Sequence, residues 1–302
     1  MKVCVTGATS FLGTALCELL RQSKAIDVFP LSRSGRPSFD MSKILESEGL
    51  GVVGEFLQKV RPDALVHLAW GHTGRGQLDD DYHLDSNLLA SKKLVDFVKT
   101  ALPTCRFIGV GSQAELGPTS SIIDESTEGI PVLAYGKAKK QLGQYLLKEL
   151  PNRSAWVKIL TLYGPGDHER KFIPYLLRTA ASGAPIEMSP GEQSWDFLHI
   201  EDAARGLKAL LESAHCVGNY ILCSGEAVSM KSVAILLCEK FRKRGVEVMD
   251  PHFGARPYLP GESMLLAGDP SRLQCEATWS PRIGLSEGLD DLVSKYLEKL
   301  SS

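Results

Sequence analysis

Short runs rich in apolar and β-branched residues alternate along the first half of the chain with longer segments whose apolar residues recur at helical spacing. The short runs predict strands near 2–6, 27–31, 64–68, 105–110 and 155–161. The longer segments predict helices near 11–22, 53–60, 81–101 and 134–150. Strands that alternate with helices are typical of a parallel sheet covered on both faces, so the pattern favours an α/β, Rossmann-type doubly wound fold.

The regular alternation ends near residue 162, and Pro and Gly become frequent after it, as in "YGPGD" and "RPYLPGE". Turn-forming residues at this density interrupt helices and strands, so we expect residues 1–162 to form the sheet domain and residues 163–302 to form mainly a smaller C-terminal lobe. Two further strands, near 196–200 and 218–224, are expected to return to the sheet of the first domain.

Composition and charge exclude several classes of protein. The 302 residues include 34 basic and 36 acidic side chains, a formal charge of −2, and 43% hydrophobic residues. This balance fits a globular protein and offers no basic stripe for nucleic acid and no cationic face for a membrane. No apolar run approaches about 18 residues and no leader precedes the first strand, so we expect a cytoplasmic protein.

Cysteine and histidine spacing gives no metal signature. The seven cysteines contain no C-x-x-C pair, and most lie in apolar runs, so we expect buried thiols. The seven histidines contain no H-x-H and no pair one helical turn apart, so no metal site is expected.

The first strand leads directly into "VTGATSFLG", residues 5–13. Glycines in such a turn let the pyrophosphate of a dinucleotide approach the unpaired amides of a helix N-terminus. Gly7 and Gly13 fit these places, but Ser10 stands where a middle glycine is expected. Its hydroxyl either caps the helix or binds phosphate, and both roles can hold together. The expected cofactor contacts in this turn are Gly7, Thr9, Ser10, Phe11 and Leu12.

The end of the second strand distinguishes NADP from NAD. A carboxylate there would bind the ribose diol of NAD, but the strand runs into "LSRSGR", with no acid before Asp40. A guanidinium forms paired charged hydrogen bonds with the 2′-phosphate of NADP, so the sequence favours NADP, with Arg33 as the main contact. The alternative is that Arg33 is a solvated loop residue. Asp40 is kept among the expected cofactor contacts.

Seven motifs follow one another along nearly the whole chain: "TGATSFLG", "HLAW" (67–70), "DSNLLAS", "GSQAELG" (111–117), "YGKAK" (135–139), "YGPGD" (163–167) and "WDFLHIEDAA" (195–204). Each is weak alone, but the ordered set resembles the extended short-chain dehydrogenase/reductase family of nucleotide-sugar epimerases, dehydratases and ketoreductases. The resemblance implies a homodimer through the helices near 81–101 and 134–150. It also implies further cofactor contacts at Leu68, Ala69, Trp70, Asn87 and Leu162.

Tyr135 and Lys139 are four residues apart in an expected helix, so their side chains share one face. The pKa of a free phenol is about 10, and a neighbouring ammonium that stabilised the phenolate would make Tyr135 a better proton relay. The resemblance adds that Lys139 grips the nicotinamide ribose and that Tyr135 exchanges a proton with the sugar oxygen. Ser112 follows a strand at the ligand-binding edge and is expected to hydrogen-bond that oxygen. The alternative is an ordinary amphipathic helix.

Two departures from the family motifs reduce the number of reactions that the resemblance allows. Sugar 4,6-dehydratases of the family have Thr-Asp-Glu where this chain has Ser112, Gln113 and Ala114, and Glu115 is expected to point elsewhere, so dehydration is disfavoured. The segments "GSQAELG", "FLHIEDAA" and "RPYLPGESM" are instead similar to bacterial 4-ketoreductases.

The resemblance therefore implies NADPH-dependent reduction of the C4 ketone of a dTDP-, CDP- or GDP-linked 4-keto-6-deoxyhexose. One alternative is a nucleotide-sugar 4-epimerase with bound NAD. A second alternative, of another class, is a non-catalytic NADP-binding regulator on the same fold.

Polar residues of the second half lie in segments that resemble the family's nucleotide-diphosphate clamp, so residues 163–302 are expected to be mainly a substrate-binding lobe. Arg256 is the main diphosphate candidate. Asp196 and Asp202 are expected to hold a turn and to cap a helix near residue 201. The expected substrate contacts are Gln113, Lys171, Trp195, Asn219, Arg256 and Glu262.

Overall fold

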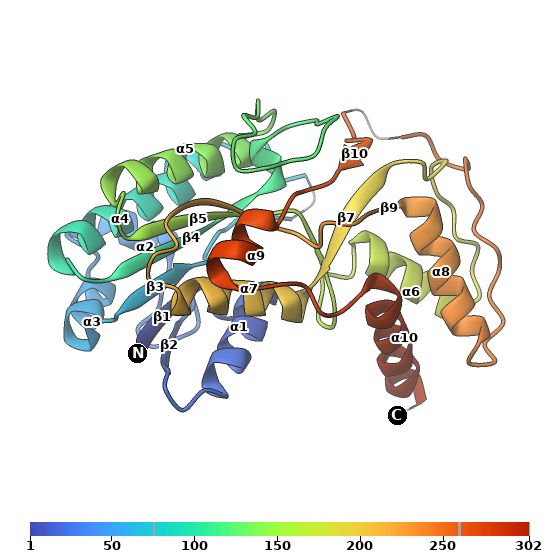
Figure 1. The fold of residues 1–302 in the computed structure, drawn as a ribbon, viewed down its shortest axis with the longest axis horizontal. Coiled ribbons are helices and arrows are strands. Elements are labelled where there is room, and N and C mark those ends of the chain that lie inside the picture. The colour runs from blue at the N-terminus through green and yellow to red at the C-terminus, as the bar shows by residue number, and fades with distance from the viewer. Residues whose placement is uncertain (75, 259–260, 302) are drawn as a thin grey trace.

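The computed structural model describes residues 1–74, 76–258 and 261–301. Its larger part is built on a six-stranded parallel sheet with the order β2-β1-β3-β4-β5-β8 (Figure 1). Its strands are β1 (Lys2–Thr6), β2 (Asp27–Leu31), β3 (Ala64–His67), β4 (Arg106–Ser112), β5 (Ser154–Ile159) and β8 (Gly218–Leu222). The strand order changes direction between β1 and β3, so the predicted doubly wound, Rossmann-type sheet is confirmed.

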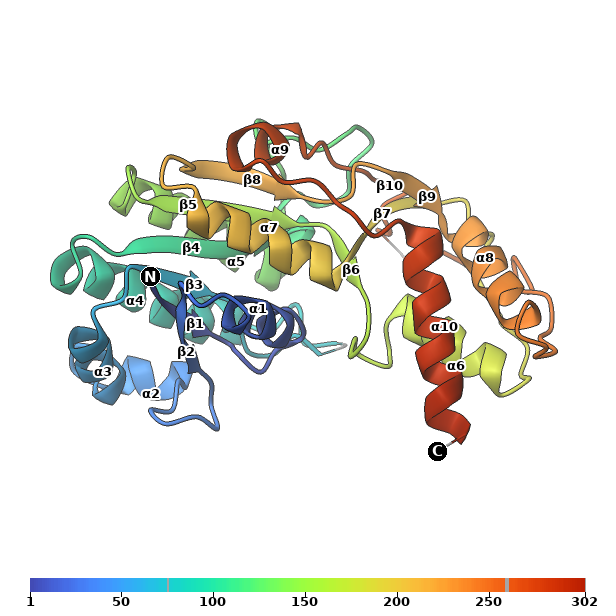
Figure 2. The same ribbon diagram turned by 60° about the horizontal axis from the view of Figure 1, so that its bottom comes forward.

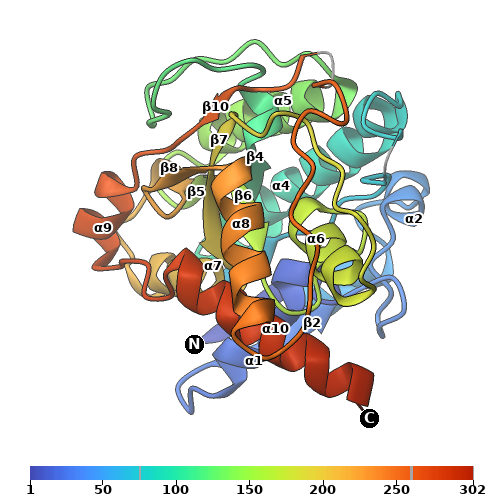
Figure 3. The ribbon, with the colours of Figure 1, turned by 90° about the vertical axis from the view of Figure 1, so that its right-hand side faces the viewer.

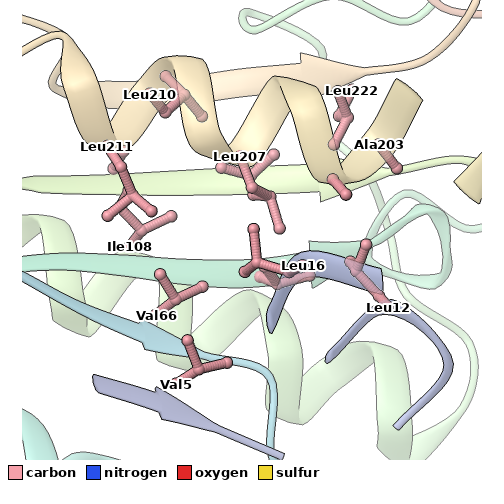
Figure 4. Packing of buried hydrophobic residues seen from close by; sticks show 14 of the residues in the cluster. Val5, Leu12, Leu16, Val66, Ile108, Ala203, Leu207, Leu210, Leu211 and Leu222 are labelled. Atoms are coloured by element: carbon pink, nitrogen blue, oxygen red, sulfur yellow. The ribbon is translucent and has the colours of Figure 1, made fainter. Parts of the chain in front are cut away.

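Helices cover both faces of this sheet (Figure 2). One face carries α1 (Phe11–Arg21), α7 (Ile200–Glu212) and α9 (Ser271–Ala277). The other face carries α2 (Met41–Glu46), α3 (Val52–Val60), α4 (Leu89–Ala101) and α5 (Ala134–Glu149). Alternate residues of each strand point to opposite faces. Val5 and Ile108 therefore join Leu16 of α1 and Leu207 of α7 in one buried cluster (Figure 4).

A smaller mixed sheet holds the C-terminal lobe. It consists of β10 (Leu265–Leu266), β7 (Ser194–His199) and β6 (Thr161–Tyr163) in this order, with β9 (Ala227–Ser229) antiparallel to β7. Its helices α6 (Phe172–Ala181), α8 (Met230–Arg242) and α10 (Leu285–Ser301) pack against one another and share a separate apolar core with β7 (Figure 3). Because β6 follows β5 almost directly, this lobe adjoins the carboxyl end of β5.

The two late strands predicted to return to the large sheet have different outcomes. The strand near 218–224 joins it as β8, parallel to β5. The prediction for the strand near 196–200 is wrong, because that strand is β7 of the smaller sheet. The reason lies at Leu160, where the predicted strand 155–161 divides into β5 and β6. β6 leaves the large sheet and offers β7 a parallel partner, with Thr161 opposite Phe197.

Two further details differ from the sequence-based expectations. The predicted helix 81–101 opens with a π-helical turn, η1 (His83–Leu88), before α4 begins. Six cysteines are buried as expected, whereas Cys275 is exposed. Within the described ranges, none of the helices is both long and apolar enough to span a membrane.

Candidate active site

The turn after β1 packs against the segment after β3, at the point where the strand order changes direction. Ligands of open α/β sheets bind at this kind of edge. Gly7 has a φ of +69°, and a Cβ added to it would lie 2.6 Å from the amide nitrogen of Ala69 and 2.7 Å from the carbonyl carbon of Leu68. Glycine is therefore required for this contact, which brings two of the sequence motifs together.

Ser10 is the N-cap of α1, and its Oγ accepts a hydrogen bond from the amide of Gly13 at 3.1 Å. A Cβ at Gly13 would lie 2.2 Å from the carbonyl oxygen of Gly7, so glycine lets the helix start close to the strand end. Thr9 is exposed and Phe11 partly exposed, whereas the side chain of Leu12 is buried in the core. This cradle fits the pyrophosphate of a dinucleotide, and Leu12 can offer it only backbone groups.

His67, at the end of β3, is held as a neutral ring. Ser91 donates its hydroxyl hydrogen to the carbonyl oxygen of Asn87 at 2.6 Å, so Ser91 Oγ accepts from His67 Nε2 at 2.9 Å. His67 Nδ1 then accepts from the Thr6 hydroxyl at 2.8 Å. Burial lowers the pKa of His67 to about 3, and the Lys139 ammonium acts in the same direction. The ring therefore joins β1, β3 and α4 and carries no charge.

Trp70 and the adjacent Gly71 are each held by one residue of η1. The indole Nε1 of Trp70 donates to His83 Nδ1 at 3.0 Å, which leaves His83 Nε2 to donate to the carbonyl oxygen of Gln77 at 3.0 Å. The buried side chain of Asn87, a predicted cofactor contact, bonds both the amide and the carbonyl of Gly71 at 3.0 Å. Asn87 therefore lies behind the loop and acts on the site by shaping it.

The loop before η1 also fixes the start of α5. The amide of Ala134 donates to Asp79 Oδ1 at 3.0 Å, and the amide of Tyr135 donates to the carbonyl oxygen of Leu78 at 2.9 Å. These bonds satisfy amides that a helix N-terminus leaves without an internal partner. Tyr135 is consequently held in the first turn of α5, with its ring edge-to-face against Trp70 at 6.1 Å.

The structure brings Ser112 and Tyr135 together, as the sequence predicts. A Cβ at Gly136 would lie 2.1 Å from the carbonyl oxygen of Ala114, so glycine allows α5 to pack directly on the turn after β4. A hydrogen bond that the Ser112 hydroxyl donates to the Tyr135 oxygen lowers the pKa of Tyr135, but burial has the larger effect and raises it. The phenol is therefore a proton donor in this arrangement.

Lys139 lies on the same side of α5 and is 4% exposed. Its Nζ donates to the carbonyl oxygen of Val110 at 2.7 Å and lies 4.0 Å above the ring of Trp70. Burial lowers the pKa of Lys139 to about 7, while the Glu115 carboxylate acts to raise it. The contacts of the ammonium are thus the Val110 carbonyl oxygen and the indole ring, and its stabilisation of a Tyr135 phenolate stays a prediction.

The sequence predicts that Glu115 points elsewhere, but it does not predict that Glu115 belongs to this buried cluster. Glu115 belongs to η2 (Gln113–Glu115) and is 2% exposed, so its carboxylate is buried in the protein. Its Oε1 accepts from the amide of Ser112 at 2.7 Å and its Oε2 accepts from Trp156 Nε1 at 3.0 Å. Ser112 and Glu115 form a capping box, and the S-x-x-E spacing of "SQAE" was the available signal.

An open groove of about 600 Å³ runs from the turn after β1 along α1 to the end of β2. Arg36, rather than the predicted Arg33, is the arginine after β2 that lines it. Arg33 is exposed, and its carbonyl oxygen accepts from the hydroxyl of Ser38. Asp40 caps α2 by accepting from the amide and the hydroxyl of Ser42. The groove is lined by Ala8, Thr9, Thr14, Cys17, Glu18, Arg21, Phe29, Pro30, Ser32, Gly35, Arg36 and Phe56.

Lys171, a predicted substrate contact, joins the lobe to the cofactor turn. It forms an ion pair with Asp167 at 2.9 Å, and its Nζ lies 5.4 Å from the ring centre of Phe11. Leu162, in β6, packs against the core beneath α1 and α7. Gln113 is partly exposed and follows Ser112 directly. These three predicted contacts therefore lie on segments that adjoin the edge of the large sheet.

The remaining predicted substrate residues lie within the lobe or on the far strand. Trp195 donates to the carbonyl oxygen of Ser263 at 2.8 Å, and Glu262 accepts from Gln193 at 2.8 Å. Asn219 is not brought to the edge. It lies opposite Trp156 near the amino end of β8, and a parallel strand offers only its carboxyl end to the ligand edge.

Arg256 is paired with Glu187 at 3.1 Å and lies 6.0 Å from the ring centre of Tyr175. Both partners belong to the lobe, and the Arg256 side chain is 57% exposed. Its guanidinium therefore faces solvent on the lobe surface, in an ion pair that a competing anion can reach.

The two aspartates of "WDFLHIED" stabilise turns. Asp196 accepts from the amides of Ser224 and Gly225, both at 2.7 Å, which confirms the turn-holding role. The expected cap of α7 is wrong for Asp202, because the N-cap is His199, whose Nδ1 accepts from the helix. The Asp202 carboxylate is buried and instead accepts from two backbone amides that precede α10.

Residues 3–221 match the family described as the NAD dependent epimerase/dehydratase family. The chain belongs to this family. Binding of NAD or NADP is typical of its members, and the glycine cradle after β1 fits such a cofactor. Across the ranges that the structure describes, no group of three or more His, Cys, Asp or Glu side chains is arranged to hold a metal ion.

Three similar proteins have three different activities. The chain is 22% identical to dTDP-glucose 4,6-dehydratase of Haemophilus influenzae over 337 residues, covering 100% of this chain and 99% of that protein. It is 22% identical to dTDP-4-dehydro-6-deoxyglucose reductase of Escherichia coli over 314 residues, covering 96% of each. The solved UDP-glucose 4-epimerase of Thermotoga maritima, with UDP-glucose, has a TM-score of 0.84 at 18% identity and covers 100% of both chains. At this level of identity, the similarity does not distinguish reduction, epimerisation and dehydration.

Proposed function

We propose that this protein reduces the C4 ketone of a nucleotide-activated 4-keto-6-deoxyhexose with NADPH. The observation that carries the proposal is the set of groups after β4. Ser112 and Tyr135 lie together at the sheet edge, while Glu115, the acid of this turn, is buried and bonded to the Ser112 amide and Trp156. The turn thus offers a proton donor for reduction but no exposed carboxyl for the elimination of water.

The chain's own residues account for the proton side of the reaction. NADPH, when bound at the glycine cradle after β1, would supply the hydride for the new C4–H bond. Tyr135 donates its proton to the C4 oxygen, which becomes the hydroxyl of the product, and solvent returns a proton to the tyrosine. Ser112 hydrogen-bonds the same oxygen and orients the ketone. Lys139, one helical turn after Tyr135 on α5, supplies a positive charge that favours the negative charge developing on the oxygen.

NADP is the proposed cofactor because two arginines follow β2 and no carboxylate ends that strand. Arg36 lines the groove beside the cofactor turn, and Arg33 is exposed near it in the same turn. A guanidinium there would meet the 2′-phosphate. A reductase consumes NADPH at each turnover, whereas the alternative epimerase would retain bound NAD.

The lobe is proposed to bind the nucleotide diphosphate. Lys171 and Gln113 are the best-placed contacts, because they lie on segments next to the cofactor turn and to Ser112. Arg256 is a second diphosphate candidate that would have to exchange Glu187 for phosphate. The homodimer through α4 and α5 remains part of this proposal.

The test is to incubate the purified protein with NADPH and a dTDP- or CDP-linked 4-keto-6-deoxyglucose while following nicotinamide absorbance and the sugar product. Equimolar loss of NADPH and ketone is expected. Tyr135→Phe should lower kcat by about 10²–10⁴-fold, the usual contribution of a general acid. Tyr145→Phe, which removes from the same helix a hydroxyl that donates to Asp96 on α4, is the matched control.

Other outcomes would support the alternatives. Isomerisation of a nucleotide sugar without net use of NADPH would point to an epimerase. NADPH binding without turnover of any nucleotide sugar would point to a regulator.

A further inference from the structure

Glu115 is a buried carboxylate directly beneath the proposed catalytic groups. Its two oxygens are bonded to different parts of the chain, at 2.7 Å to the amide of Ser112 and at 3.0 Å to the indole of Trp156. Charge-assisted bonds of this kind are short and directional. The bond to Ser112 fixes the backbone that carries its hydroxyl, so the position of that hydroxyl depends on Glu115.

Three glycines leave space for the Trp156 indole and the Glu115 carboxylate. A Cβ at Gly109 would lie 2.6 Å from the Trp156 ring, one at Gly111 would lie 2.7 Å from its Nε1, and one at Gly143 would lie 2.6 Å from the ring. A Cβ at Gly111 would also lie 2.2 Å from Glu115 Oε1. One strand, β4, and one helix, α5, therefore carry glycines where the indole and the carboxylate meet, and a larger residue at these positions would displace both groups.

Glu115 and Lys139 approach the same indole, since Glu115 Oε2 accepts from Trp156 Nε1 at 3.0 Å and Lys139 Nζ lies 6.0 Å from the centre of the Trp156 ring. Burial raises the pKa of Glu115 and lowers the pKa of Lys139, and each charge opposes the shift of the other. An isolated buried ammonium is costly, because it has lost its hydration shell. A carboxylate that is itself held by two hydrogen bonds can offset much of this cost.

The other titratable groups near Glu115 and Lys139 cannot replace Glu115 as the negative charge that offsets the Lys139 ammonium. His67 on β3 and His83 on η1 are neutral rings whose pKa values are lowered by burial. Tyr135 on α5 is a protonated phenol. Lys158 on β5 is a second cation near the carboxylate, which favours the charged form of Glu115.

We propose that Glu115 is a positioning residue for this site, which holds Ser112 in place and provides the counter-charge that keeps Lys139 an ammonium. The effect of Glu115 on turnover rests on the proposed reductase function. The effect of Glu115 on the charge of Lys139 does not depend on which reaction the protein catalyses. The two can therefore be tested separately.

The first test measures the charge of Lys139 without any sugar. The protein is labelled with ¹³C at the lysine ε-carbons, the signal of Lys139 is assigned with Lys139→Met, and its chemical shift is followed against pH. The midpoint of the Lys139 titration in the wild type is expected at a pH of about 7. In Glu115→Gln it should fall by at least about one pH unit, because the counter-charge is lost.

Two variants control this titration. Trp156→Phe removes one hydrogen bond to Glu115 but leaves its charge, so the Lys139 midpoint should stay within a few tenths of a unit of the wild type. Glu149→Gln removes a carboxylate that pairs with Lys99 on the surface, and it should leave the midpoint unchanged. An unchanged Lys139 midpoint in Glu115→Gln would overturn the counter-charge role. If Glu115→Gln does not fold, Glu115→Asp decides instead: its retained charge must keep the midpoint within about half a unit of the wild type.

The second test uses turnover. The kcat/KM profile should fall on its alkaline side as Lys139 loses its proton, and Glu115→Gln should move this limb to lower pH. Glu115→Asp should restore the limb while kcat stays about tenfold low, because the shorter side chain does not reach Ser112. An alkaline limb that is the same in Glu115→Gln and the wild type would contradict the proposal. If the wild type turns over no nucleotide sugar, the reductase function fails while the lysine titration still decides the role of Glu115.

Discussion

Polar side chains at the edge of the large sheet and those on the surface of the C-terminal lobe are held by different kinds of contact. At the edge, His67, Asn87 and Glu115 are buried, and the side chain of each forms at least two hydrogen bonds with fixed groups. In the lobe, Arg256 and Glu187 form an ion pair in which the side chains are 57% and 47% exposed. Buried networks specify one geometry, whereas exposed pairs contribute little and exchange partners easily.

This difference suits the two tasks that we propose. Proton transfer needs the donor, the serine and the ketone in one arrangement, because small displacements are costly for a reaction. Binding of a nucleotide diphosphate tolerates more adjustment. Substitutions that compare the two regions should therefore have their largest effects at the edge of the large sheet.

The largest effect is expected for Gly7→Ala. Alanine at a φ of +69° costs about 1–2 kcal/mol, and its Cβ would also lie 2.6 Å from the backbone of Ala69. Gly183→Ala in the lobe is the matched control, because its φ is +68° but no atom lies within 4 Å. Thermal unfolding and NADPH fluorescence titration should show loss of stability and of NADPH binding for Gly7→Ala. Gly183→Ala should lose only the backbone cost, and equal losses in the two variants would show that the contact with Ala69 is unimportant.

A smaller effect is expected for the arginines after β2. Arg36→Ala should weaken NADPH binding by about ten- to a hundredfold and NADH binding far less, because hydrogen bonds to a charged group contribute about 1.5–3 kcal/mol. Arg33→Ala separates the residue predicted from the sequence from the one that lines the groove. A larger loss of NADPH affinity in Arg33→Ala would restore the original assignment. Equal losses of NADPH and NADH would argue against NADP.

The lobe ion pair should respond less. Arg256→Ala is expected to change the free energy of unfolding by less than about 1 kcal/mol, because the pair is exposed. If Arg256 binds the diphosphate, KM for the nucleotide sugar rises about tenfold while kcat is unchanged, since this contact is the same in substrate and transition state. A fall in kcat at constant KM would place Arg256 in the reaction itself and would remove the contrast between the two regions.

The smallest effect is expected at Ser10. Its hydroxyl caps α1, and glycine at an N-cap costs only a few tenths of a kcal/mol relative to serine. Ser10→Gly should therefore leave both unfolding and NADPH affinity nearly unchanged. A marked loss of NADPH affinity at constant stability would show that the hydroxyl binds the cofactor as well as capping the helix.

Much of the large sheet and its edge is predictable from local patterns. The alternation of strands and helices places β1 to β5, and the spacing of Tyr135 and Lys139 places both on one face of α5, with Ser112 at the end of β4. Glu115 could have been found as well, because the S-x-x-E capping box is a local signal. These features depend on backbone period and on residues close in sequence, which the chain shows directly.

Only the tertiary structure decided which partners distant segments take. The division at Leu160 assigns β7 to the smaller sheet, because a strand pairs with whatever edge the packing of the whole chain presents. The ammonium of Lys139 contacts Val110 and Trp70, which its spacing from Tyr135 does not reveal, and Asn219 lies near the amino end of its strand. The sequence determined the elements and the types of reactive group. Their directions, burial and counter-charges follow from long-range packing, which no local pattern encodes.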